Sequence, residues 1–149
     1  MRNSVFPKNP KQYDGFLFIR IIAFVYLLVV VARSAIHLFA PDGGAESIAG
    51  IDTGGPDGNN VIAIFHQWGA IQLLLVAVLL TLFFAYRGFT PLVILALCMD
   101  APLRALAGQM SDLETSHTPP GEALNWPIFW FLVVLFIASL FKKKTSPRL

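Results

Sequence analysis

The chain has 149 residues, of which 56% are hydrophobic and 13% are charged, and its mean hydropathy is +0.65. A soluble domain usually carries about 25% charged residues, so this composition favours a protein embedded in a membrane. The net charge of +2 is too small to indicate a nucleic-acid partner. The single cysteine, Cys98, excludes an internal disulfide framework and a cysteine-rich metal site. We expect one domain over residues 1–149.

Four long apolar stretches are separated by proline, glycine and polar residues. They run over about residues 16–40, 61–86, 91–109 and 126–141. Pro41 and the glycines after it end the first stretch, the turn over residues 57–60 precedes the second, and Pro91 suits the first turn of the third. The fourth is short against the ~20 residues that a transmembrane helix needs. The pattern predicts an all-α fold, a four-helix transmembrane bundle within one integral membrane domain.

The charged residues between these stretches predict the orientation in the membrane. The N-terminal tail, the Arg87 turn and the run Lys142-Lys143-Lys144 are basic, whereas the loops over 41–60 and 110–125 carry acids and contain no Lys or Arg. By the positive-inside rule, both termini are cytoplasmic. The first apolar run is too long for the core of a signal peptide and lacks a clear cleavage site. We therefore expect an integral protein of the bacterial inner (cytoplasmic) membrane.

Two charges lie within the third apolar stretch. Asp100 and Arg104 are four residues apart, so they share a helix face and can form an ion pair. A charge in the hydrocarbon core costs about 2.5–3.5 kcal/mol on insertion scales, which makes these residues candidates for function. Pro102 lies between them and leaves the carbonyl of Cys98 without its helical donor.

Polar residues of the other helices are expected at a similar depth. At the helical rise, Arg33 lies about 10 Å from the outer end of its helix, and His66 and Arg104 about 8 Å from theirs. On the first helix His37 shares the face of Arg33, and Tyr26 lies nearly on it. Small residues mark helix contacts in membranes, so the stripes that contain His66 and Asp100 are expected to face the bundle. These stripes are Ala63, Ala70 and Ala77 on the second helix and Ala96, Ala107 and Gly108 on the third.

Several short motifs, taken in order, resemble the DoxX-like superfamily of small four-helix membrane proteins, and in particular a bacterial branch of it. The resemblance covers about residues 20–108. The motifs are Arg20 at the start of the first helix, Pro41, Gly50-Ile51, Trp68-Gly69-Ala70-Ile71-Gln72, Leu103-Arg104 and Gly108. Where the family often has an arginine before the aromatic-glycine step, this chain has Phe65-His66. The resemblance implies the four-helix fold, and it implies no single reaction.

The first functional hypothesis is a polar pocket in the outer half of the bilayer for a lipid-soluble small molecule, such as a quinone or a terpenoid. The pocket either simply binds this molecule or also transforms it by acid–base chemistry. His66 is the candidate acid or base, since a neutral histidine suits proton transfer near pH 7, and Asp100 is expected to tune it. Arg33 and Arg104 are the candidate ligands for an anionic or carbonyl oxygen. His37, Tyr26 and Gln67 complete the expected binding site.

Two other functions stay open. In the first, the chain is a non-catalytic subunit or scaffold, and some DoxX-like relatives are thought to be partner subunits of oxidoreductases. A protein partner or a second copy would then meet the aromatic residues of the fourth helix, which are Phe129, Trp130, Phe131 and Phe136. In the second, His37 and His66 ligate haem, or join Asp100 as a metal-binding set. Ion conduction is less favoured because the polar groups stop near the midplane. The sequence names no cofactor.

Overall fold

The computed structural model describes residues 3–111 and 113–143, and this part of the chain contains helices and no strand. The all-α prediction is therefore confirmed. Arg2 and Lys144, which belong to the basic ends, and Asp112 of the second acidic loop lie outside the described residues. The helices are α1 (Leu17–Phe39), α2 (Gly58–Ala85), the 3-10 turn η1 (Arg87–Phe89), α3 (Thr90–Cys98), α4 (Asp100–Met110), α5 (Pro120–Ala123) and α6 (Asn125–Ser139).

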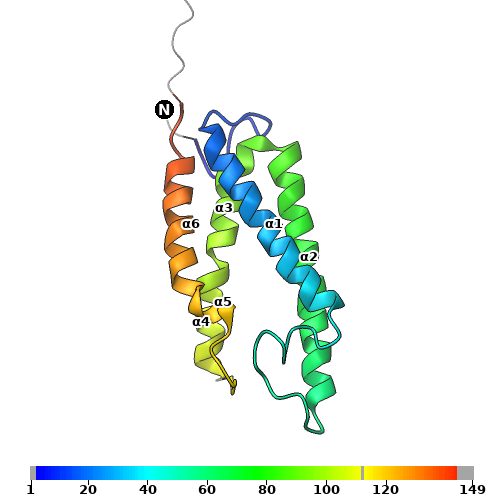
Figure 1. The fold of residues 1–149 in the computed structure, drawn as a ribbon. Coiled ribbons are helices and arrows are strands. Elements are labelled where there is room, and N and C mark those ends of the chain that lie inside the picture. Colours follow the sequence, from blue (N-terminus) through cyan, green and yellow to red (C-terminus); the bar gives the residue numbers. More distant parts are fainter. Residues whose placement is uncertain (1–2, 112, 144–149) are drawn as a thin grey trace, which may run out of the picture.

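α1 and α2 form one closely packed pair (Figure 1). Their closest approach is at Gly69, where an added Cβ would lie 2.5 Å from the backbone nitrogen of Leu38. Only glycine allows two helix backbones to come this near, as in other membrane helix pairs. α2 begins at Gly58, three residues before the predicted start. The last residues of α1 lie beside Gly69, towards the middle of α2.

The predicted single helix over 91–109 is broken at Met99 into α3 and α4. Pro102 is the cause, because it has no N–H to donate to the carbonyl of Cys98 four residues earlier. The break makes Asp100 the first residue of α4. A carboxylate in the first turn of a helix is stabilised by the unpaired N–H groups there, which offsets part of the cost of placing this acid among apolar residues.

The apolar core lies in the half of the molecule that is nearest the termini. α3 packs along α6, and this pair meets α1 and α2 in that half, while towards the loop over 41–57 the two pairs lie further apart (Figure 1). The buried core residues include Ile19, Ala23 and Leu27 of α1, Val76, Leu79 and Phe83 of α2, Val93, Ile94 and Leu97 of α3, and Leu132 and Leu135 of α6. The polar residues of the site begin where this core ends.

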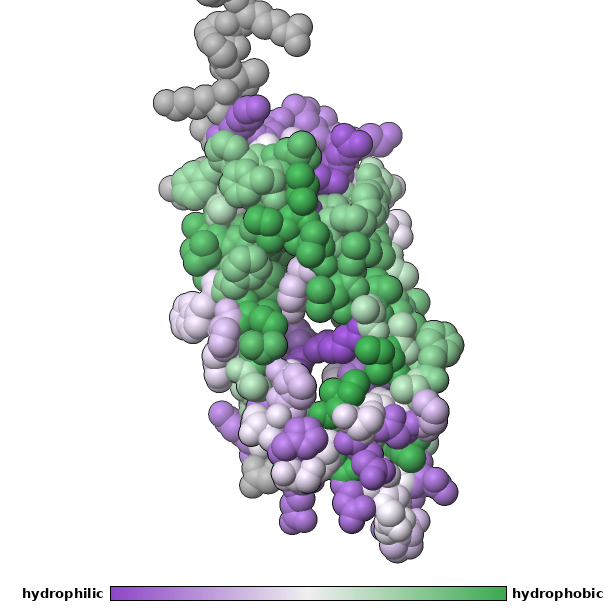
Figure 2. All heavy atoms as spheres, in the orientation of Figure 1, coloured by the Kyte–Doolittle hydropathy of each residue, from purple (hydrophilic) through white to green (hydrophobic). Residues whose placement is uncertain are grey.

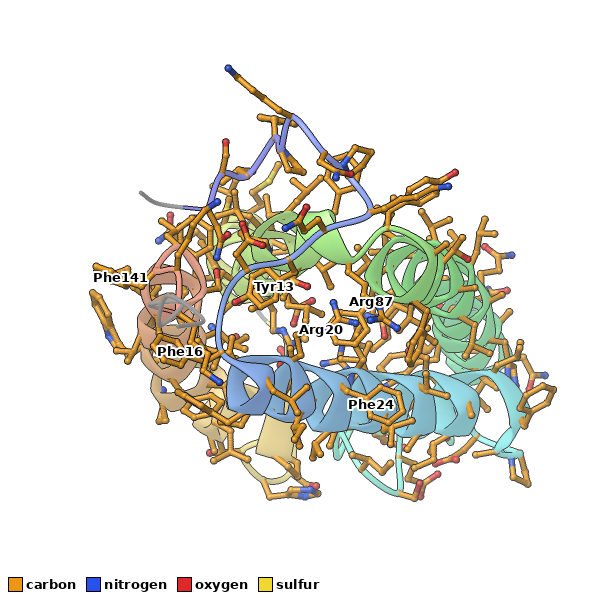
Figure 3. All side chains as sticks on the ribbon, turned by 90° about the horizontal axis from the view of Figure 1, so that it is seen from above. Tyr13, Phe16, Arg20, Phe24, Arg87 and Phe141 are labelled. Atoms are coloured by element: carbon orange, nitrogen blue, oxygen red, sulfur yellow. The ribbon has the colours of Figure 1, made fainter. Side chains whose placement is uncertain are left out.

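The N-terminal segment crosses the end of the molecule and joins the end of α6 (Figure 3). Lys142 contacts Asp14 at 2.6 Å, and the hydroxyl of Tyr13 donates to the carbonyl of Ser139. Hydrogen bonds from Lys142 and from Gln12 hold the pKa of Asp14 below its ordinary value, and burial raises the pKa of Tyr13 to about 12. Both described ends of the chain therefore lie on the same side of the helices.

At the same end of the molecule, the side chain of Arg20 lies between the helices. In Figure 3 its side chain points among the helices, close to Arg87. It donates to the hydroxyl of Thr90 at 2.7 Å and to the carbonyl of Phe83 at 2.9 Å, and its guanidinium stacks 4.2 Å from the centre of the Phe83 ring. Arg20 thus holds α1, α2 and the start of α3 together, a structural role that uses its donors.

By length and composition this is a membrane protein. Three helical segments are long and apolar enough to cross a membrane, namely Leu17–Phe39, Gly58–Ala85 and Arg87–Met110 taken through the break at Met99. Figure 2 shows an apolar band between two hydrophilic ends. α6 is also apolar but has 15 residues, about 22 Å at the helical rise, against a hydrocarbon thickness of about 30 Å.

Candidate functional site

Four polar side chains from three helices meet where the apolar core ends. Arg104 donates to a carboxylate oxygen of Asp100 at 2.5 Å, and Nη1 of Arg33 lies 3.8 Å from the same oxygen. The other terminal nitrogen of Arg33, Nη2, donates to the amide oxygen of Gln72 at 3.2 Å. The structure thus brings Arg33 of α1 to the pair Asp100 and Arg104 of α4, and adds Gln72 of α2 to them.

The residues on both sides of this cluster hold it in position. The buried hydroxyl of Ser34 lies 3.1 Å from the amide oxygen of Gln72. At the other side, Arg104 lies against the backbone of α5, since a Cβ added at Gly121 would be 2.6 Å from its Nη1. Asn125, the first residue of α6, donates to the carbonyl of Ala101. α4 is therefore fixed to α5 and α6, while Arg33 and Gln72 belong to the α1–α2 pair.

A cleft of about 60 Å³ opens beside the cluster. Arg33, Gln72 and Asp100 supply its polar wall, and Tyr26 also lines it. The remaining lining is apolar and consists of Val30, Leu75, Val76, Leu79, Ala96 and Leu97. Figure 2 shows a hollow between the α6 side and the α1 side of the molecule, at the edge of the apolar band, with hydrophilic atoms inside it.

Arg33 is the least satisfied member of the cluster. Its Nε is buried and has no hydrogen-bond partner among the described residues, and its Nη1 is beyond ordinary hydrogen-bond distance of Asp100. The guanidinium also lies 5.7 Å from the ring centre of Trp68, within the range of a cation–π contact. A buried donor without a partner costs about 1–3 kcal/mol. An acceptor that entered the cleft would pair with Nη1, and it would reach Nε only after the side chain of Arg33 moved.

The two histidines take other partners. Nδ1 of His66 donates to the carbonyl of Leu38 at 2.8 Å, and Nδ1 of His37 donates to the carbonyl of Gly43 at 2.7 Å. His66 satisfies one of the carbonyls that the end of α1 leaves without a helical donor. It is level with Leu38, which is five residues after Arg33 and so about 7–8 Å nearer the C-terminal end of α1. The expected tuning of His66 by Asp100 has no contact to support it among the described residues.

The face of α2 that meets α1 differs from the predicted one. Ala63, Ala70 and Ala77 are exposed, as are Ala107 and Gly108 of the third predicted helix, so the expectation that these five small residues face the bundle is wrong. Ala96 is also exposed, but it lines the cleft. α2 instead packs through a stripe at helical spacing, made of Gly69, Gln72, Val76, Leu79 and Phe83. Gln67 lies on the exposed side of α2. Gln72 lies three residues after Gly69 and so shares its helix face. This spacing was the signal in the sequence that Gln72 faces α1.

The donor sets proposed for a metal are not assembled. Among residues 3–111 and 113–143, no group of three or more His, Cys, Asp or Glu side chains lies close enough to hold a metal ion. His37 packs against aromatic rings, with its ring centre 4.5 Å from that of Trp68 and 5.7 Å from that of Phe65. Its surroundings are those of a packed structural side chain.

The loop after α1 is ordered by a carboxylate. Asp42 accepts hydrogen bonds from the backbone N–H groups of Ser47 and Gly44, which lower its pKa. Gly43 and Gly44 adopt positive φ values of 60° and 77°, conformations that glycine tolerates best. This turn presents the carbonyl of Gly43 to His37 and so fixes the C-terminal end of α1.

Comparison with known proteins adds no relative. No family model matches the chain, and no curated protein or solved structure is significantly similar to it. The resemblance to the DoxX-like superfamily and the roles of the site residues therefore stay predictions.

Proposed function

We propose that the protein binds a lipid-soluble molecule whose polar head carries an oxygen acceptor, in the cleft between α1, α2 and the α3–α4 column. The observation that carries this proposal is Arg33, whose buried Nε has no partner and whose Nη1 is only loosely paired. An arginine in an apolar setting is costly unless its donors are used. An oxygen of such a head group would pair with Nη1.

Binding is better supported than turnover. The acid–base hypothesis needs His66 beside Asp100, but the described hydrogen bond of His66 goes to Leu38 and that of Asp100 comes from Arg104. The carboxylate of Asp100 lies between the guanidinium groups of Arg104 and Arg33 and has no contact with His66 among the described residues. We therefore assign to Asp100 the positioning of the two arginines.

The proposed arrangement in the membrane follows from the charges. α1, α2, the α3–α4 column and α6 would each cross the bilayer as a four-helix bundle, with both termini in the cytoplasm of a bacterial cell. The end that carries the termini is basic, through Lys8, Lys11, Arg87 and Lys142. Fusion of a periplasm-active enzyme to the C-terminus should give no activity, and fusion within the 41–57 loop should give activity; the reverse result would refute this orientation.

The proposed function is tested by what the protein retains on purification. Wild-type protein and the variants Arg33→Gln and Gln72→Leu are purified in a mild detergent, extracted with organic solvent and analysed by mass spectrometry. Lys8→Gln, which removes one positive charge from an exposed position far from the cleft, is the matched control. We expect a lipid-soluble species near one per chain in wild type and in Lys8→Gln, and its loss from the two cleft variants.

Equal recovery from all four proteins would refute the proposal, because the species would then be bulk lipid. Thermal unfolding of each variant shows whether a loss reflects the site or the fold. Membership of the DoxX-like superfamily, and with it a role as a partner subunit, would be favoured instead if a larger protein co-purified in constant ratio with every variant.

A further inference from the structure

We infer that the ligand is a single-chain amphiphile with one carboxylate head, such as a long-chain fatty acid. The head lies in the cleft against Arg33, and the tail lies in a second, apolar groove between α1 and α6. This inference rests on the proposed function and narrows it from any lipid-soluble molecule to a monoanion. Three features carry it: the charge of the cluster, the loosely paired Nη1 of Arg33 and the position of Tyr26.

The cluster has one cationic group more than it has anionic groups. Arg33 and Arg104 face a single carboxylate, Asp100, and Gln72 adds no charge. Arg104 is paired with Asp100 at the shorter distance, so the uncompensated charge lies on Arg33. In a low-dielectric site such a charge attracts an anion far more strongly than it does in water. A neutral quinone or terpenoid would leave the charge uncompensated.

Arg33 keeps a donor that a carboxylate can use. Nη2 is used by Gln72, whereas Nε has no partner and Nη1 is loosely placed. Nε and Nη1 lie on different edges of the guanidinium, so a carboxylate oxygen in the cleft is held by a charge-assisted hydrogen bond from Nη1. The cleft of about 60 Å³ accepts a carboxylate and gives little space for a bulky head. The hydroxyl of Tyr26, which also lines the cleft, has no hydrogen bond in the described part of the chain.

Tyr26 also lines the apolar groove. This groove of about 240 Å³ is formed by Ile21, Ile22, Val25, Tyr26 and Val29 of α1 and by Phe131 of α6. Its surface is almost wholly apolar, which suits an alkyl chain. Because one tyrosine borders both spaces, a ligand passing beside it places its head in the cleft and its tail in the groove. The hollow between the α6 and α1 sides in Figure 2 is the corresponding route of entry.

The test compares an acid with its ester. Wild-type protein in lipid nanodiscs is loaded with parinaric acid, a polyene fatty acid that accepts excitation energy from tryptophan, and Trp68 beside Arg33 supplies a local donor. Palmitate, methyl palmitate and decylubiquinone are then added as competitors, with empty nanodiscs as the background. We expect palmitate to displace the probe at a concentration about tenfold lower than its methyl ester does. Arg33→Gln should remove this difference, and Lys8→Gln should keep it.

The groove is tested separately. Val25→Phe narrows it without adding a tryptophan, and Leu28→Phe makes the same kind of change on another exposed face of α1. We expect Val25→Phe to weaken palmitate displacement at least about fivefold and Leu28→Phe to leave it unchanged. Equal effects of the two variants would overturn the placement of the tail.

The remaining outcomes separate this inference from the proposed function. If decylubiquinone or the ester competes as well as palmitate, and Arg33→Gln abolishes that competition, the carboxylate is refuted and the binding site stands. If no competitor displaces the probe from wild type at lower concentration than from empty nanodiscs, both are refuted. If Arg33→Gln does not fold, Gln72→Leu is used in its place. The ratio of the concentrations at which palmitate and methyl palmitate displace the probe from wild type then still tests whether the head is a carboxylate.

Discussion

Asp100 accepts a hydrogen bond from Arg104 across one turn of α4 and lies 3.8 Å from Arg33 of α1. Its carboxylate is thus shared by two guanidinium groups, so Asp100→Asn should leave both cations without a counter-ion. We expect this variant to lose about 2 kcal/mol of unfolding free energy, below the range for fully buried pairs because these side chains are partly exposed. Denaturant-induced unfolding in detergent micelles measures the loss.

Arg33→Gln is the matched variant, because it leaves Asp100 paired with Arg104. It should be less destabilising than Asp100→Asn, and the double variant should be more stable than Asp100→Asn alone. Additive effects of the two changes would show that Arg33 and Asp100 do not interact.

Gly69 and Gly108 should respond in opposite ways to alanine. A Cβ at Gly69 meets the backbone of Leu38 and His37, whereas one at Gly108 meets nothing within 4 Å. Gly69→Ala should force α1 and α2 apart and cost about 1–3 kcal/mol. Gly108→Ala should be neutral or stabilising by up to about 1 kcal/mol, since alanine favours the helix. Thermal unfolding of both variants checks this, and equal effects would contradict the close approach at Gly69.

His66 should behave as a structural donor. His66→Ala removes the hydrogen bond to the carbonyl of Leu38 and should cost about 1 kcal/mol of unfolding free energy. His66→Gln should restore part of it, because an amide can donate to the same carbonyl. Binding of the polyene fatty acid should stay as in wild type. If His66→Ala lost as much binding as Arg33→Gln, His66 would belong to the binding site, and the acid–base hypothesis would be supported again.

Acid should release the contact between the N-terminal segment and α6. The pKa of Asp14 is lowered in the folded protein by Lys142 and Gln12, so its ion pair stabilises the fold above the unfolded pKa of about 3.9 and is lost as the pH falls through the folded value. The difference in Tm between wild type and Asp14→Asn should therefore be present at pH 7 and disappear towards pH 3. The exposed Glu114 supplies the control, and Glu114→Gln should match wild type at every pH.

The sequence predicts the helical class and most helix limits well, because long apolar runs with proline and glycine between them leave few alternatives. It also predicts that Asp100 pairs with Arg104, since a four-residue spacing fixes that geometry within one helix. The approach of Arg33 to the same carboxylate follows from the depth of each residue. Depth along a helix is simple to count from its ends.

The rotation of each helix is harder to predict. Alanines looked like the contact face of α2, yet one glycine, Gly69, decides the crossing, and its position turns Gln72 inward and Ala70 outward. An alanine stripe tolerates a neighbouring helix, but it does not require one. His66 was expected at the level of Arg33, but it lies beside Leu38, five residues further along α1.

Because of the break at Met99, the distance between Asp100 and Arg104 is fixed within α4, whereas the distance between Asp100 and Arg33 can change. Asp100 and Arg104 belong to the same short helix, whose main neighbours are α3 and α6, so they move together. Arg33 is carried by the α1–α2 pair, which Gly69 locks. A movement of α4 together with α5 and α6 against the α1–α2 pair therefore changes the separation between Asp100 and Arg33, while the contact between Asp100 and Arg104 is kept.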